Sequence, residues 1–119
     1  NKFCYSAQCH DTARLIAKKL GLTEDKYSVC FQSRLGKEPW VQPYTTDVLK
    51  KLAAEGKKRL LVFSPAFVAD CLETLIEIGE EYQEIFEEHG GEKVQLVPSS
   101  NSHPLFVNGL EKLIRQKMN

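Results

Sequence analysis

The chain has 119 residues, of which 42% are hydrophobic and 27% are charged, as expected for one globular domain with a single core. Sixteen basic residues balance sixteen acidic ones, so no net charge favours binding to nucleic acid. No apolar run approaches the ~20 residues of a membrane span and no signal peptide is recognisable, so we expect a cytoplasmic protein, with a peripheral position at the inner membrane left open.

The first third of the chain predicts a helix followed by a strand. Ser6 is a suitable N-terminal cap, apolar residues recur at helical spacing as far as Leu20, and Gly21 suits the left-handed position after a helix. Tyr27–Gln32 is rich in aromatic and β-branched residues, which favours a strand. Residues 33–44 contain one glycine and two prolines, and this composition predicts an irregular loop.

The middle of the chain predicts a second helix and a buried strand. Thr45 or Thr46 is expected to cap a helix that stops at Gly56. Arg59–Ser64 contains four consecutive apolar residues, which is typical of a strand buried on both faces.

The remaining segments continue the alternation. Pro65 is expected to open a third helix that bends near Gly79. Lys93–Val97 predicts a third strand, and Leu105–Gln116 predicts a closing helix. The apolar residues of that last helix are expected to face inward: Leu105, Phe106, Leu110, Leu113 and Ile114.

This alternation predicts an α/β domain with a small parallel sheet flanked by helices. Three strands are few for such a sheet, and no strand precedes the first helix. The only methionine is Met118, so the chain begins at Asn1 without an initiator. We therefore expect residues 1–119 to form a single domain of a longer protein, with an upstream strand missing.

The pattern that says most about function is a row of carboxylates. Glu73, Glu77 and Glu81 recur every four residues and so share one helical face, although like charges at this spacing repel. The row either lines a cleft, where it could bind a cation or relay protons, or is a solvated acidic face. From the residues alone, the solvated face is favoured.

Two further side chains could contact a ligand. Trp40 lies between two prolines and could be a wall for a planar ligand or an anchor for its loop, and the spacing favours neither. Arg34 suits a ligand carboxylate or a structural ion pair, and the ion pair is favoured.

The histidines and cysteines show no recognisable catalytic or metal-binding spacing. His10, His89 and His103 lie in separate segments, and we expect surface roles for them. The four cysteines are scattered and are expected to be reduced thiols: Cys4, Cys9, Cys30 and Cys71.

Several motifs resemble those of one known family. Residues 31–45, Phe-Gln-Ser-Arg-Leu-Gly-Lys-Glu-Pro-Trp-Val-Gln-Pro-Tyr-Thr, resemble the FQSRxGxxPWLxPxT signature of ferrochelatases. Residues 65–78 resemble the family's PxFxxDxxETLxEI helix. Residues 8–17 are similar to its segment before the signature, and residues 90–92 and 98–101 match its tail.

The resemblance implies an enzyme of two flavodoxin-like, three-layer lobes that inserts ferrous iron into protoporphyrin IX in haem biosynthesis, a lyase reaction. This chain would be roughly the C-terminal third, and its partners would be the N-terminal lobe, the porphyrin and ferrous iron. The motifs do not distinguish protoporphyrin from coproporphyrin.

Carried over by position, the resemblance also assigns roles to residues. Glu73 matches the catalytic glutamate, and Glu77 and Glu81 match the acidic line that leads from it, on a helix that widens into a π-turn. Asp70 matches an acidic neighbour, so the predicted metal-binding set is these four carboxylates. The residues expected near the porphyrin are Gln32, Ser33, Arg34 and Trp40. With the resemblance, the interpretation of the acidic row changes in favour of function.

The chain also departs from the family pattern. Cys71 stands where some members have histidine, and a neutral thiol is a poor substitute for imidazole. The family's Ser-x-His-Gly-x-Pro segment and the C-terminal cysteines that bind a [2Fe–2S] centre are not found, so we expect no cluster, no permanent cofactor and no activity of the chain alone. A non-catalytic porphyrin- or metal-binding module of the same fold is the alternative. A generic flavodoxin-like interaction domain is disfavoured, since it leaves the 31–45 loop unexplained.

Overall fold

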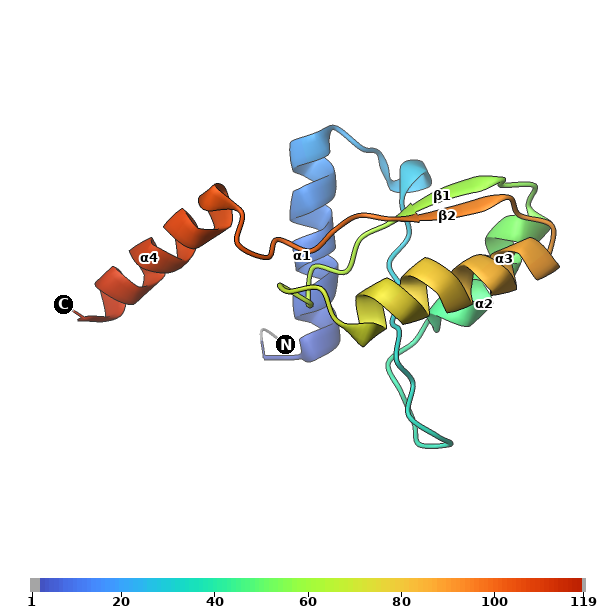
Figure 1. Ribbon diagram of the computed structural model, residues 1–119, viewed down its shortest axis with the longest axis horizontal. Coiled ribbons are helices and arrows are strands. Elements are labelled where there is room, and N and C mark those ends of the chain that lie inside the picture. Colours follow the sequence, from blue (N-terminus) through green and yellow to red (C-terminus); the bar gives the residue numbers. More distant parts are fainter. Residues whose placement is uncertain (1–2, 119) are drawn as a thin grey trace.

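The computed structural model describes residues 3–118, in which two parallel strands are accompanied by helices (Figure 1). In chain order the elements are α1 (Tyr5–Leu20), the short 3₁₀ helix η1 (Glu24–Lys26), α2 (Thr45–Ala54), β1 (Arg59–Val62), the π-helix η2 (Glu73–Tyr82), α3 (Gln83–Glu88), β2 (Lys93–Leu96) and α4 (Pro104–Met118). The expected α/β class with a small parallel sheet is confirmed. No helix among these residues combines the length and hydropathy needed to cross a bilayer.

The core lies on one face of the sheet. β1 and β2 pair in register from Arg59 opposite Lys93 to Val62 opposite Leu96. Alternate residues of a strand point to the same face, and those of both strands pack against α2, η2 and α3. The buried members of this core are Leu49, Ala53, Ile78, Tyr82, Phe86 and Val94.

The strand expected at Tyr27–Gln32 does not form. The segment is extended, but its one pairing is an isolated bridge between Phe31 and Tyr44, in which Phe31 N–H donates to the Pro43 carbonyl at 2.9 Å. A cavity of about 1,410 Å³ separates the segment from β1. A high β-propensity indicates that a segment can join a sheet, but a ladder also needs a neighbouring strand within hydrogen-bonding distance.

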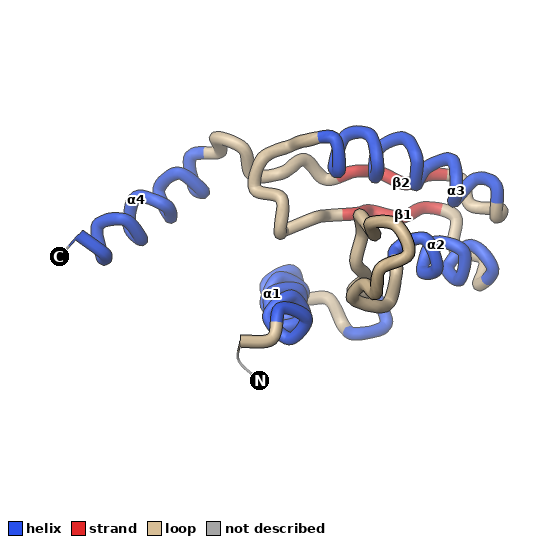
Figure 2. The backbone as a smooth tube through the Cα atoms, turned by 90° about the horizontal axis from the view of Figure 1, so that it is seen from below, coloured by secondary structure: helices blue, strands red, loops and turns tan. Residues whose placement is uncertain are grey.

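Two apolar surfaces expected to be buried are exposed instead. Leu61 of β1 points to the face opposite the core and is 70% exposed, so the strand is not buried on both faces. Helix α4 extends away from the body of the molecule (Figures 1 and 2), and the expectation that its apolar side chains face inward is wrong. Leu113, for example, is 60% exposed, because no described residue packs against that side of the helix.

Most of the helix starts predicted from the sequence are also wrong. The N-caps of α1 and α2 are Cys4 and Tyr44, without a side-chain cap bond, so neither Ser6 nor a threonine caps its helix. Pro65 lies in a turn, and the third helix begins only at residues 72–73. That helix does not bend at Gly79 but continues as a π-helix through Tyr82. The C-terminal signal of α1 is confirmed, since Gly21 has φ 70°.

The tightest packing constraint in the core involves a glycine. A Cβ atom on Gly91 would lie 2.3 Å from the Phe86 ring, and Phe86 is 0% exposed and cannot move aside. We predict that Gly91→Ala lowers the free energy of unfolding by about 1–3 kcal/mol, the usual cost of overpacking. Urea unfolding measures this change.

Gly109 provides the matched control. It lies within α4, and a Cβ there would meet no atom within 4 Å. Gly109→Ala should leave stability unchanged or raise it by up to about 1 kcal/mol through helix propensity. Equal urea midpoints for Gly91→Ala and the unsubstituted chain would contradict the packing argument.

Candidate functional site

The carboxylate row lies on the π-helix. A π-helix bonds residue i to i+5 and is wider than an α-helix, so residues four and five apart share one side. Glu73 and Glu77 are half-buried and Glu81 is exposed. Glu77 and Glu81 border a hollow of about 330 Å³, which Glu73 does not line. The expected π-turn is therefore present and spans Glu73–Tyr82.

Glu77 is held by three hydrogen bonds to a single oxygen. Its Oε1 accepts from Gln32 Nε2 at 2.7 Å, from Ser33 Oγ at 2.9 Å and from the Tyr82 hydroxyl at 3.1 Å. Burial, together with the neighbouring Glu77 carboxylate, raises the pKa of Tyr82, so this hydroxyl stays protonated and donates. Tyr82 is not among the residues predicted from the sequence. It follows Glu77 by five positions, and residues five apart share one side of a helix in a π-helix.

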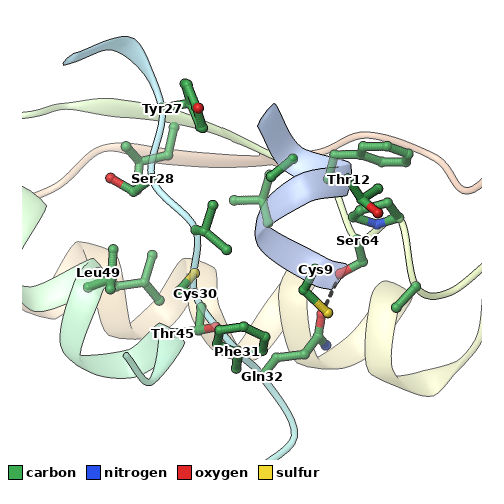
Figure 3. A pocket seen from close by; sticks show the side chains of 18 of the residues that line it. Cys9, Thr12, Tyr27, Ser28, Cys30, Phe31, Gln32, Thr45, Leu49 and Ser64 are labelled. Carbon is green, nitrogen blue, oxygen red and sulfur yellow. Dashed lines mark hydrogen bonds between the residues drawn. The ribbon is translucent and has the colours of Figure 1, made fainter. Parts of the chain in front are cut away.

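Gln32 joins three segments of the chain. Its Nε2 also donates to the Glu73 main-chain carbonyl at 2.8 Å, and its Oε1 accepts from the Ser64 hydroxyl at the end of β1. Its own carbonyl accepts from the Trp40 indole N–H at 3.0 Å. Gln32 and Ser64 point toward one another in Figure 3. The 31–34 segment, β1 and η2 therefore meet at this residue, as expected for the carboxyl edge of a parallel sheet.

The 1,410 Å³ cavity, which we call the trench, runs between residues 27–33 and β1. Its other walls come from the first half of α1 and from α2 (Figure 3). Trp40 borders it and remains 39% exposed, so the indole both anchors its loop through the N–H and offers a ring face. Pockets for small ligands usually enclose about 300–1,000 Å³, so the trench exceeds what one ligand needs.

Asp70 connects the start of the π-helix to the loop after β2. Its Oδ1 accepts from the Ser99 backbone N–H at 3.2 Å and from the Thr74 hydroxyl at 3.0 Å. Its Oδ2 accepts from Asn101 Nδ2 at 2.9 Å. The Asn101 amide, followed by the Ser99 N–H, lowers the pKa of Asp70. Both oxygens of Asp70 thus bind donors of the protein itself.

Arg34 does not form the ion pair that the sequence favoured. Its guanidinium carbon lies 4.5 Å from the centre of the Tyr44 ring, in a cation–π contact, and no carboxylate among residues 3–118 pairs with it. Arg34 and Tyr44 both border the smaller hollow beside Glu77. A guanidinium that no carboxylate neutralises keeps its charge available to an anionic group of a ligand.

The described residues contain no preformed metal centre. Within residues 3–118, no three side chains of His, Cys, Asp or Glu are grouped so that they could hold a metal ion. The predicted metal-binding set of Asp70, Glu73, Glu77 and Glu81 stays a prediction. The three histidines are exposed, as expected, and two of them bond to nearby backbone: His89 Nδ1 lies 2.8 Å from the Ile85 carbonyl, and the Leu105 N–H donates to His103 Nδ1 at 3.2 Å.

Comparison with known proteins identifies relatives over nearly the whole chain. The family model described as Ferrochelatase matches residues 1–118. A ferrochelatase of Coxiella burnetii is 49% identical over 118 residues, which is 99% of this chain and 33% of that protein. Ferrochelatases of Ectopseudomonas mendocina and Azotobacter vinelandii are 54% and 52% identical over 92% and 94% of this chain, and over 32% and 33% of their own lengths. The chain thus spans about a third of the curated relatives that it matches.

The Asp70 bonds generate a prediction about pH. Because the folded state lowers the pKa of Asp70 below its usual 3.8, the stabilisation is complete above that value and is lost as pH falls through the folded-state pKa. Asp70→Asn presents an amide N–H to Asn101 and should lower the urea midpoint at pH 7. The difference from the unsubstituted chain should shrink steadily below pH ~4.

Glu88→Gln is the control for this measurement, since Glu88 is exposed at the end of α3. Its midpoint should follow that of the unsubstituted chain at every pH. A deficit for Asp70→Asn that stays constant from pH 7 to pH 2 would contradict the role of the ionised carboxylate.

Proposed function

Because this chain belongs to the ferrochelatase family, we propose that it forms part of an enzyme that inserts ferrous iron into protoporphyrin IX, a lyase reaction of haem synthesis in the cytoplasm. Porphyrin and ferrous iron are the proposed substrates, and a second lobe of the same enzyme is the proposed partner. The observation that carries the proposal is the contrast between two carboxylates on one π-helix: Glu77 is tied by three donors, whereas Glu73 is not.

This contrast suits the two tasks of metal insertion. The porphyrin must lose two pyrrole protons, and the metal must lose its water ligands. Within the described residues the Glu73 carboxylate makes no hydrogen bond or ion pair, so it can accept a proton as a general base. Glu77 and Glu81 offer hard oxygen ligands to ferrous iron on its way to the ring. No iron–sulfur cluster and no permanent cofactor are part of this proposal.

The proposed porphyrin site is the end of the trench where Trp40 and Ser64 lie. The indole face suits a planar macrocycle, since apolar aromatic surface binds an aromatic ring through its face. Arg34 has no carboxylate partner among the described residues and borders the smaller hollow beside Glu77, and its guanidinium suits a propionate of the porphyrin.

The rest of the trench suits an additional strand. β1 pairs only with β2 among the described residues, so its other edge is open along the trench. The rings of Tyr5 and His10 lie 6.5 and 6.0 Å from that of Phe31, which places the start of α1 where the 27–31 segment ends. A strand parallel to β1 would end at that edge and lead directly into α1, as in a strand–helix unit. We propose that the remainder of the enzyme supplies this strand.

The first prediction of this proposal concerns Glu73. A chimera in which this chain replaces the matching third of the Coxiella burnetii relative would provide the whole enzyme. In it, Glu73→Gln should lower the rate of anaerobic insertion of zinc or ferrous iron at least about 100-fold, since it removes the general base. Porphyrin binding, followed by absorbance, should persist.

Glu88→Gln, an exposed change of the same kind, should leave the rate unchanged. Normal turnover by Glu73→Gln would refute the role given to Glu73. If the unsubstituted chimera binds porphyrin but inserts no metal, a non-catalytic porphyrin-binding module is the correct function.

The second prediction concerns the chain by itself. The open edge of β1, the exposed Leu61 and the apolar side of α4 should cause self-association that rises with concentration, as measured by light scattering. Leu61→Lys should reduce the association, because a lysine on an open edge opposes pairing. Leu35→Lys, in an exposed loop, should not. A monomer throughout the concentration series would contradict the uncovered surfaces.

A further inference from the structure

The structure assigns Gln32 a different role from the porphyrin contact that its motif suggested. We propose that Gln32 is a positioning residue, which fixes Glu77 so that this carboxylate presents only one oxygen, Oε2, to a metal ion. The proposal rests on the proposed function, since it concerns how the acidic row handles the metal substrate.

The Gln32 side chain has no hydrogen-bond donor left for a ligand. Its two amide hydrogens are used by the Glu73 carbonyl and by Glu77 Oε1, at 2.8 and 2.7 Å. Its oxygen accepts from the Ser64 hydroxyl. In this orientation the amide nitrogen faces two acceptors and the amide oxygen faces a donor. If the amide were flipped, its oxygen would face the two acceptors, the Glu73 carbonyl and Glu77 Oε1. The side chain is also half-buried and so faces the protein on several sides.

The backbone conformation at Ser33 brings a second donor to the same oxygen of Glu77. Neighbouring side chains of an extended segment point to opposite sides, yet Gln32 and Ser33 both donate to Glu77 Oε1. This is possible because Ser33 has φ 61°, a left-handed conformation that is uncommon for a serine. The segment therefore adopts an unfavourable backbone conformation that brings two donors to the same oxygen.

These three hydrogen bonds limit how the Glu77 carboxylate can bind a metal ion. Gln32, Ser33 and Tyr82 all donate to Oε1, so a metal that also bound Oε1 would have to displace at least one of these donors, and bidentate chelation is opposed. A single oxygen can replace one water of a divalent ion and still release the ion afterwards. Passage along a row of sites needs binding that is strong enough to admit the ion and weak enough to let it leave.

The test uses Gln32→Met in the whole-enzyme chimera, because methionine keeps the length and removes the donors. The KM for zinc and ferrous iron should change at least about fivefold, while the KM for porphyrin stays within twofold of the unsubstituted value. Gln42→Met is the matched control, since Gln42 lies in the same loop and its side chain makes one hydrogen bond within residues 3–118, an exposed one of 3.5 Å to the Tyr44 hydroxyl.

A double-mutant cycle shows whether Gln32 acts through Glu77. In a Glu77→Ala background, Gln32→Met should have no further effect on the metal KM. Additive effects, or a raised porphyrin KM with an unchanged metal KM, would overturn the proposal and restore the porphyrin contact. Calorimetric titration of Zn²⁺ without porphyrin gives a reading independent of turnover. An unchanged Kd in Gln32→Met overturns the positioning role, whereas a wild-type chimera that binds Zn²⁺ but inserts no metal refutes only the proposed function.

Discussion

The site depends on the hydrogen bonds of one amide. Gln32 connects the 31–34 segment to the end of β1 and to the π-helix, and the residues that it bonds there follow it by 32 to 45 positions in sequence. A hydrogen bond contributes little in water-exposed surroundings, but all three of these bonds are part-buried, where losing a partner costs more. The amide also determines where Glu77 sits relative to Glu73. The geometry of the acidic row is therefore set from outside the helix that carries it.

The sheet has fewer of its potential contacts formed than the residues around Glu77 and Asp70. Two four-residue strands pack one face against α2, η2 and α3, and neither outer edge of the sheet pairs with a further strand among the described residues. Yet the bonds at Glu77 and Asp70 are complete without those missing contacts. The carboxyl edge of the sheet is built from side chains bonding across loops, which requires neither a continuous sheet nor a third layer. The hydrogen bonds around Glu77 and Asp70 are therefore formed within this chain, although its sheet has only two strands among the described residues.

Sequence patterns predicted the parts of the fold that depend on local or periodic features. β1 follows from its apolar run, α1 ends where Gly21 allows a positive φ, and the glutamate row follows from its spacing. The patterns failed where the outcome depends on a distant neighbour. Tyr27–Gln32 has the composition of a strand but pairs with described residues only through the single bridge of Phe31 to Tyr44. The apolar side of α4 has no described surface to cover. Tyr82 could not be assigned, because its link to Glu77 needs a spacing of five that only a π-helix provides.

The π-helix explains why a row of like charges is tolerated at all. In an α-helix, glutamates four apart face one another with nothing between them, and repulsion is reduced only by solvent. Here the wider turn admits the hydroxyl of Tyr82 and the amide of Gln32, so that Glu77 faces hydrogen-bond donors rather than only its neighbours. The donors stabilise the Glu77 carboxylate, whereas the Glu73 carboxylate on the same helix has no hydrogen-bond partner among the described residues. Two identical residues on one helix therefore differ in chemistry, because the helix geometry surrounds one carboxylate with donors and leaves the other open.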